Sequence, residues 1–224
     1  MKHAKQWYKG RLFSVLGDSI STFEDMQPLG YPVYYQYERR QLNDLSSHSD
    51  CWWQQVIDAF GGKLLANASF SGGYVVKSPY YPESLASALH PDRRERLSQN
   101  GREPDVILLY LGTNDLGYGT MAEKQDPLCC FPTAYSALLA GLRARYPQAE
   151  LWCFTLCPSD ASPFSHADFM RYNAVIAQCA KQAGACLVDL YDPAFRYSTE
   201  DGLHPNRKGM VQIAEAALKS LAYR

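Results

Sequence analysis

The sequence predicts an α/β protein: a three-layer sandwich in which helices cover both faces of a five-stranded parallel sheet. Three observations predict this class. Five short runs are almost continuously hydrophobic, as strands covered on both faces must be. Segments with the hydrophobic spacing of helices separate these runs, and such alternation gives parallel strands with right-handed crossovers. A length of 224 residues, with 46% hydrophobic side chains, favours a single domain over residues 1–224.

The first expected strand covers residues 11–17 (RLFSVLG), and the others follow at intervals that leave room for a helix. In sheets of this kind, ligands bind beyond the carboxyl ends of the strands. Functional side chains are therefore expected directly after each run. The remaining expected strands are residues 63–68 (KLLANA), 105–112 (DVILLYLG), 150–157 (ELWCFTLC) and 185–190 (ACLVDL).

The expected helices are marked by hydrophobic residues three and four positions apart and by ordinary start and stop signals. A glycine pair follows the first helix, and Pro132 stands in the first turn of the third. The second has the weakest pattern. The expected helices are residues 52–60, 84–97, 132–146, 167–183 and 206–221.

Charge and cysteine content exclude several functional classes. The 22 basic and 23 acidic side chains leave a net charge of −1, which disfavours nucleic acid or a membrane surface as a partner. No apolar run approaches the roughly 20 residues that span a bilayer, and no signal peptide follows the first lysines, so a cytoplasmic location is expected. The seven cysteines include no C-x-x-C pair, so they are expected to be reduced and mostly buried.

The first candidate site residue is Ser19, which follows the first strand in residues 17–22 (GDSIST). A serine at a strand-to-helix turn exposes its hydroxyl at the edge of the sheet where ligands bind, near amides that favour an anion. The alternative interpretation is that Ser19 is the N-cap residue of a helix.

Two further segments could supply hydrogen-bond donors to an oxyanion. Asn114, in residues 112–115 (GTND), can direct its side-chain amide toward developing negative charge. Residues 67–73 (NASFSGG) offer backbone amides that no side chain obstructs. Ordinary turns explain both segments equally well.

His204 and Asp201 lie together in residues 201–206 (DGLHPN), before the last helix. Histidine is the usual base that activates a serine, and a carboxylate three residues earlier can fix its tautomer. A surface loop that caps the helix is the alternative. The other four histidines lack a comparably placed acidic residue.

These four segments occur in order at the ends of strands one, two, three and five. Together they resemble the SGNH hydrolases, also called the GDSL esterase and lipase family, over essentially the whole chain. The resemblance implies a flavodoxin-like fold, hydrolysis of acyl esters and no cofactor or metal. It assigns Ser19 as nucleophile, His204 as base, Asp201 as acid, and Ser19, Gly72 and Asn114 as the oxyanion hole.

Two positions depart from the family pattern. Ile20 stands where the family name has leucine, which leaves the role of the serine intact. Gly73 stands where a small polar residue is common, so either neighbouring glycine amide could point into the oxyanion hole.

The loops beside the site indicate a small ester as the substrate. Residues 22–50 are rich in tyrosine, including Tyr31, Tyr34 and Tyr35, and these rings could wall a pocket or pin the loop to the surface. None of the long loops contains the apolar helix that covers a lipase site. Short acyl groups, such as acetyl, on a small polar or carbohydrate carrier are therefore favoured.

Three other functions fit part of the same pattern. An acyltransferase would use the same triad. A flavin-binding module would leave Asn114 and His204 unused. A metal-dependent hydrolase could draw on Asp18, Asp115, Asp201 and His204.

Overall fold

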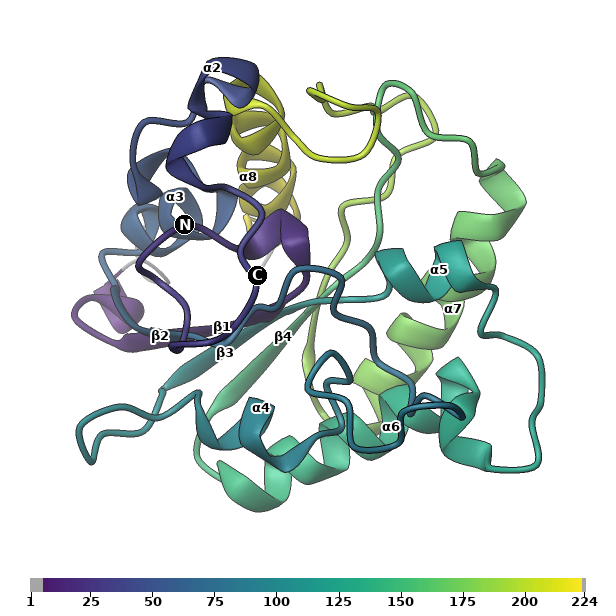
Figure 1. Cartoon of the computed structure of the whole chain (residues 1–224). Helices are drawn as coiled ribbons and strands as arrows, with labels where there is room; N and C mark the ends of the chain where they lie inside the picture. Colours follow the sequence, from purple (N-terminus) through teal and green to yellow (C-terminus); the bar gives the residue numbers. More distant parts are fainter. Residues whose placement is uncertain (1–5, 223–224) are drawn as a thin grey trace.

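The computed structural model describes residues 6–222, and at its centre lies one sheet of five parallel strands (Figure 1). The strand order is β2-β1-β3-β4-β5, so the first strand is internal and pairs with both β2 and β3. This all-parallel α/β architecture is the predicted fold. The strands are β1 (Leu12–Gly17), β2 (Lys63–Asn67), β3 (Val106–Tyr110), β4 (Glu150–Phe154) and β5 (Cys186–Val188).

Helices cover both faces of the sheet. On one face α3 (Trp52–Ala59) packs against α8 (Arg207–Leu221), and Figure 1 shows this pair above the sheet. On the other face α6 (Phe131–Arg145) packs against α7 (His166–Gln182). The helix α4 (Pro91–Glu95) lies beside α6 in the same view.

Several short elements connect these layers, and most of them lie in the loops that follow the strands. They were not predicted, because one or two helical turns leave no hydrophobic period to detect. These elements are η1 (Ser19–Ser21), η2 (Tyr37–Arg39), α2 (Arg40–Asn43), η3 (His48–Asp50), α5 (Thr113–Tyr118) and η4 (Pro127–Cys129).

The helix expected over residues 84–97 is largely wrong, since only Pro91–Glu95 is helical. The residues before Pro91 pair with another segment instead of forming helical hydrogen bonds. The Tyr74 amide donates to the Ala86 carbonyl, and the Ala88 amide donates to the Tyr74 carbonyl. Pro91 cannot donate a helical hydrogen bond and fits only the first turn. The helix therefore begins at Pro91, with the His90 side chain as its cap.

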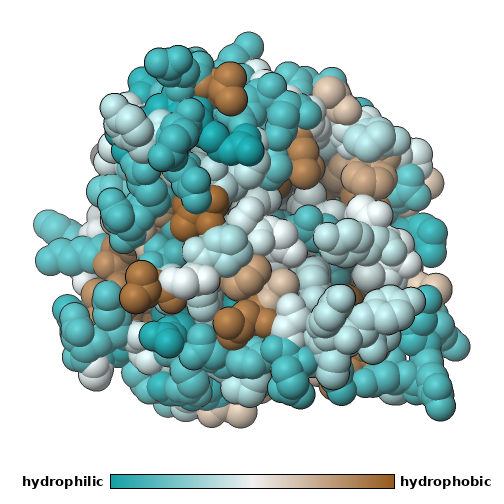
Figure 2. Space-filling view, in the orientation of Figure 1, coloured by the Kyte–Doolittle hydropathy of each residue, from teal (hydrophilic) through white to brown (hydrophobic). Residues whose placement is uncertain are grey.

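The core is continuous from the sheet into both helical layers, and its largest members are the buried indoles of Trp52, Trp53 and Trp152. All seven cysteines are buried and carry free thiols. Hydrophilic side chains dominate the face in Figure 2, where apolar residues form only small groups. Among residues 6–222, no helix is long and apolar enough to cross a membrane.

Candidate active site

The chain turns sharply after β1, and this turn presents Ser19. The Asp18 side chain accepts a hydrogen bond from the Ile20 amide at 3.0 Å, so Asp18 rather than Ser19 caps the short helix η1. A Cβ atom at Gly17 would lie 2.5 Å from the Ser21 hydroxyl, so only glycine fits there. The Ser19 hydroxyl is thus free of a capping role.

Ser19, His204 and Asp201 form a continuous hydrogen-bonded chain. His204 Nε2 lies 2.9 Å from Ser19 Oγ, and His204 Nδ1 lies 2.8 Å from Asp201 Oδ2. The second oxygen of Asp201 accepts the backbone amides of Leu203 and His204 at 3.0 and 2.8 Å. These amides fix the carboxylate, which in turn fixes the imidazole beside the serine.

The electrostatic environment favours a neutral imidazole and an ionised carboxylate. Burial lowers the pKa of His204 below its ordinary value, against the opposing effect of Asp201. Burial also acts to raise the pKa of Asp201, but hydrogen bonds from the His204 amide, the Tyr34 hydroxyl and the imidazole outweigh it and leave that pKa lowered. Near neutral pH the pair is therefore poised to accept a proton at Nε2.

Asn114 lies at the start of α5, close to the loop that follows β2. Its Nδ2 donates to the Gly73 carbonyl at 2.7 Å. A primary amide carries two N–H hydrogens, so this bond leaves one for another acceptor. The structure thus brings the third sequence segment into direct contact with the second.

The two adjacent glycines of that loop differ in their surroundings. The Gly73 amide donates to the Phe70 carbonyl at 2.8 Å, and a Cβ atom at Gly73 would lie 2.8 Å from the same oxygen. Gly72 has a φ of +79°, which favours glycine, and its amide makes no hydrogen bond among residues 6–222. Of the two amides, only that of Gly72 is therefore available to a ligand.

A buried arginine lies behind the site and ties the ends of two strands together. Arg93 is fully buried and donates at 2.9 Å to both the Gly17 and the Ala68 carbonyls. Burial lowers its pKa to about 10 and raises the pKa of the neighbouring Asp18 to about 7. Because Gly17 precedes Ser19 and Ala68 precedes the Gly72 loop, this one side chain positions both segments.

The tyrosine-rich segment contributes a site residue that the sequence could not single out. Tyr34 stacks on the His204 ring with the centroids 3.4 Å apart, while Tyr35 donates to the Pro205 carbonyl and Tyr31 to Asp92. Tyr31 and Tyr35 thus anchor the loop, whereas Tyr34 stacks on His204, and none of the three lines the pocket beside Asp201. No regular spacing distinguishes Tyr34 from the others.

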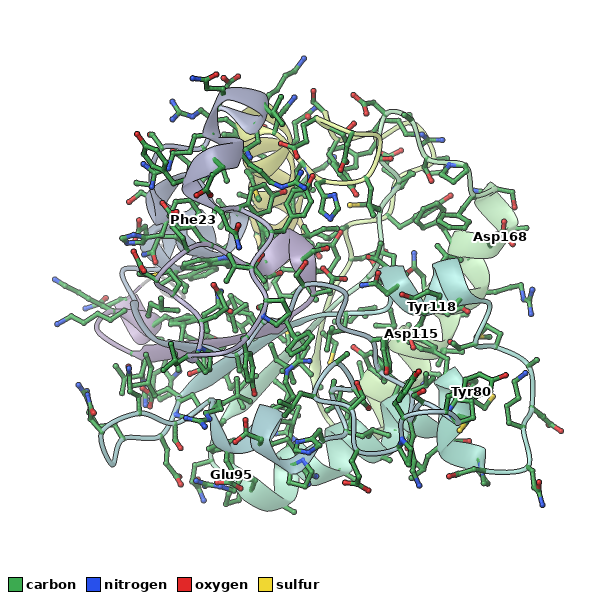
Figure 3. All side chains as sticks on the ribbon, viewed as in Figure 1. Phe23, Tyr80, Glu95, Asp115, Tyr118 and Asp168 are labelled. Carbon is green, nitrogen blue, oxygen red and sulfur yellow. The ribbon has the colours of Figure 1, made fainter. Side chains whose placement is uncertain are left out.

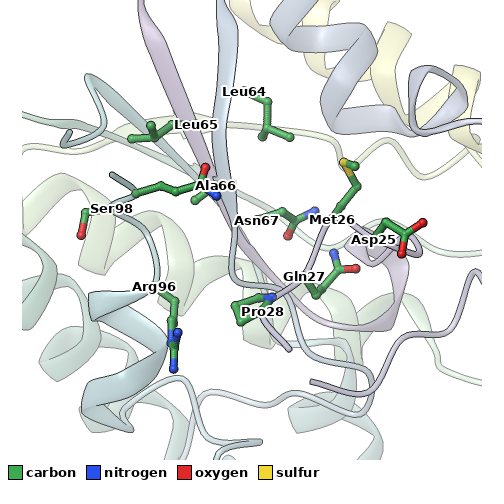
Figure 4. Close-up of a pocket in the computed structure, with 11 residues that line it drawn as sticks. Asp25, Met26, Gln27, Pro28, Leu64, Leu65, Ala66, Asn67, Arg96 and Ser98 are labelled. Atoms are coloured by element: carbon green, nitrogen blue, oxygen red, sulfur yellow. The ribbon is translucent and has the colours of Figure 1, made fainter. Parts of the chain in front are cut away.

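A pocket of about 350 Å³ adjoins the triad and is mainly apolar. Its lining includes Asp201, Gly202 and Leu203 together with Leu116, Phe164 and Phe169, but neither Ser19 nor His204. A second pocket, of about 400 Å³, lies at the edge strand β2 between residues 25–28 and Arg96 (Figure 4). None of the triad residues lines that second pocket.

The four side chains considered for a metal do not form a metal site. In the described part of the chain, no group of three or more His, Cys, Asp and Glu residues is arranged to hold an ion. Asp115 illustrates the reason, because its carboxylate is buried and accepts the Val75 and Val76 amides.

Comparisons with known proteins identify the family of the chain. The family model for GDSL-like lipases and acylhydrolases matches residues 11–221. None of the curated proteins matches the chain. Among solved structures, one described as a GDSL-like lipase from Bacteroides ovatus is similar at 25% identity and a TM-score of 0.75, over 96% of this chain and 100% of that one.

Two more distant structures share the fold alone. A carbohydrate esterase of family 3 from Talaromyces cellulolyticus is 20% identical with a TM-score of 0.58, over 95% of this chain and 97% of that one. A salicylyl-acyltransferase from a tetracycline biosynthetic pathway is 18% identical with a TM-score of 0.60, over 96% of this chain but 55% of that one. The family match spans nearly all of the described residues, so the chain belongs to the GDSL-like lipase/acylhydrolase family and is a carboxylic ester hydrolase.

Proposed function

We propose that this enzyme hydrolyses esters of short acyl groups, such as O-acetyl, on a small polar or carbohydrate carrier through an acyl-enzyme on Ser19. The observation that carries the proposal is the unbroken chain of hydrogen bonds from Ser19 through His204 to Asp201. Serine is a weak nucleophile until a base removes its proton, and this arrangement supplies that base.

In the first step, Ser19 Oγ attacks the ester carbonyl carbon while His204 Nε2 takes the hydroxyl proton. The carbonyl π electrons move onto oxygen, and the Ser19 amide, the Gly72 amide and the free N–H of Asn114 stabilise the resulting oxyanion. As the first residue of η1, Ser19 has an amide with no acceptor inside the helix, which supports this role.

In the second step, the tetrahedral intermediate collapses and the bond to the leaving oxygen breaks. His204 returns its proton to that oxygen, which releases an alcohol and leaves the acyl group on Ser19. Water then attacks the acyl-enzyme with His204 again as the base. The bond to Ser19 Oγ breaks as His204 returns the proton to that oxygen, which releases the carboxylic acid and restores the serine. Throughout the cycle Asp201 remains ionised and stabilises the transient imidazolium.

Two features support a small substrate. The apolar pocket beside Asp201, at about 350 Å³, lies near the lower end of the usual range for ligand sites and would hold a short acyl chain. Tyr74 and Tyr118 form an edge-to-face pair that follows the Gly72 and Asn114 segments, and Tyr118 is 67% exposed. Figure 3 labels Tyr118 at α5, and its exposed ring could contact a polar carrier.

The test is a panel of p-nitrophenyl esters from acetate to octanoate, together with acetylated sugars. Wild type should favour the shortest acyl groups, and Ser19→Ala should lower kcat by about 10⁴–10⁶. The matched control is Ser98→Ala, which changes a half-buried serine outside the site and should leave turnover unchanged. A fluorophosphonate should label the wild type and the control but not Ser19→Ala.

Two results would overturn the proposal. Turnover by Ser19→Ala within tenfold of wild type would exclude the acyl-enzyme, and a preference for octanoate would exclude the short acyl group. An added alcohol separates hydrolysis from transfer: if most of the acyl group appears on that alcohol rather than on water, the enzyme is an acyltransferase with the same triad.

A further inference from the structure

The Tyr34 side chain stacks on His204, the proposed base, although no step of the proposed reaction uses Tyr34. Its ring lies almost parallel to the His204 imidazole, at an interplanar angle of 14° and a centroid separation of 3.4 Å. Its backbone amide donates to Thr22 Oγ1 at 2.9 Å, and that hydroxyl donates to the Ser19 carbonyl at 2.9 Å. The ring over His204 is therefore tied to the turn that bears Ser19.

The Tyr34 hydroxyl also reaches the acid of the triad. It lies 2.6 Å from Asp201 Oδ2, the same oxygen that faces His204 Nδ1, and it also contacts Glu200. A phenol has one proton to donate, so it can serve only one carboxylate at a time. Arg39 donates to Glu200 at 3.3 Å, so Glu200 keeps a donor when the phenol proton serves Asp201.

Arg39 and Glu200 hold Tyr34 in place. The Arg39 guanidinium lies 4.3 Å from the centre of the Tyr34 ring and donates to its hydroxyl at 3.0 Å. The Glu200 side chain is only 3% exposed, so its ion pair with Arg39 is shielded from water on one side. Such a half-buried ion pair resists screening better than an exposed one.

We propose that Tyr34 is a positioning residue for the base: its ring fixes the plane of the His204 imidazole, and its hydroxyl draws charge from Asp201 and so limits how readily His204 binds a proton. This inference rests on the proposed function. The charged and titratable groups that face His204 are Asp201 and Glu200 in its own loop, Arg39 and Tyr34 in the segment above it, and Ser19 at Nε2.

The two parts of the side chain should have separable effects. Without the hydroxyl, the Asp201 carboxylate keeps more negative charge on the oxygen that faces His204, so the imidazolium becomes easier to form. Without the ring, the imidazole can rotate away from Ser19, and a misplacement of about 1 Å can cost about 10²-fold in rate. The first change moves a pH profile, and the second lowers kcat.

The experiment compares Tyr34→Phe and Tyr34→Ala with wild type. For Tyr34→Phe, the acid limb of kcat/KM should move upward by about half a unit to one unit, with kcat on its plateau within about tenfold of wild type. For Tyr34→Ala, plateau kcat should fall by about 10–100-fold while KM changes little.

Tyr35→Phe is the matched control. Tyr35 is the next residue, and its hydroxyl donates to the Pro205 carbonyl without touching His204. Its loss should lower thermal stability and leave the acid limb where it is. A merely structural tyrosine at position 34 would behave in the same way, so a Tyr34→Phe profile that superimposes on wild type would overturn the proposal.

A second measurement keeps this inference separate from the proposed function. Titration of the His204 ring protons by NMR reports the pKa of the imidazole directly, without substrate, and can be done in the Ser19→Ala background. Tyr34→Phe should raise that pKa by the same half to one unit. An unchanged pKa contradicts the inference even if the enzyme is active, whereas a raised pKa in an enzyme without esterase activity contradicts only the proposed function.

Discussion

The hydrogen bonds of Asn114 predict how its substitution changes kcat. One of its amide hydrogens is donated to the Gly73 carbonyl at 2.7 Å, and in the proposed mechanism the other is donated to the substrate oxygen. Asn114→Ala should therefore cut kcat by about 10²–10³ and change KM little, because negative charge develops on that oxygen only in the transition state. Steady-state kinetics on p-nitrophenyl acetate measures kcat and KM separately.

Loss of the Gly73 bond could also disturb the loop after β2, so the thermal unfolding midpoint of Asn114→Ala should be recorded beside its kinetics. A fall in kcat of less than fivefold, or a loss confined to KM, would remove Asn114 from the oxyanion hole. A rate loss with an unchanged midpoint would be the clearest support.

A single site residue can be predicted from the sequence when both its type and its position after a strand are distinctive. Ser19, Asn114 and His204 each follow a hydrophobic run or precede the last helix. The structure places His204 beside Ser19 and Asn114 against the Gly73 loop. The sequence could not distinguish Gly72 from Gly73, since the difference lies in φ and in the approach of the Phe70 carbonyl. It could not select Tyr34 either, because five aromatic residues of one loop look alike until the loop is folded.

Among the elements, α4 has an importance out of proportion to its five residues, because it delivers Arg93 to the core. Arg93 donates to the carbonyls of Gly17, Ala68, Leu85 and Ala86. Arg93→Met should lower the free energy of unfolding by about 3–5 kcal/mol, since it strands several buried carbonyl groups. Urea denaturation at pH 7 measures this loss.

The control for Arg93 lies three residues further along the chain. Arg96 is 55% exposed and pairs with Asp92 in an i,i+4 salt bridge. Arg96→Met should cost less than about 1 kcal/mol, as exposed pairs usually do. If Arg93→Met were as mild as Arg96→Met, the guanidinium would not be what ties the strand ends together.

The elements themselves were predictable where a hydrophobic run or a helical period is long. All five strands lie inside the expected runs. The first run ends where β1 ends, and the other four continue past their strands into the loops that follow. The helix expected at residues 84–97 was wrong because the side chains of Ser84 and Ser87 bond to nearby backbone amides. Such local bonds compete with a helix and have no periodic signature.

For the molecule as a whole, two buried carboxyl groups predict how stability varies with pH. Burial raises the pKa of Asp18 to about 7 and that of Asp115 to about 6, both from 3.8. A raised pKa means that the folded state holds a proton more tightly than the unfolded one. Their stabilising contribution is therefore complete below about pH 4 and is lost as pH rises through 6 and 7.

Asp18→Asn should consequently gain stability relative to wild type between pH 5 and pH 8, as measured by urea denaturation across that range. Asp168→Asn is the control, because hydrogen bonds from Ser165 lower the pKa of that exposed carboxyl (Figure 3). The difference between Asp168→Asn and wild type should stay constant over the same range. A constant difference for Asp18→Asn as well would contradict the raised pKa.

The separation of Ser19 and His204 along the chain has a consequence for how the enzyme is made. Ser19 and His204, the proposed nucleophile and base, are 185 residues apart in the chain, so a ribosome produces one early and the other late. At about 5–20 residues per second, His204 is synthesised roughly ten to forty seconds after Ser19. Until then Ser19 lacks the base that we propose for it, so we expect a growing chain to build most of its sheet before it gains esterase activity.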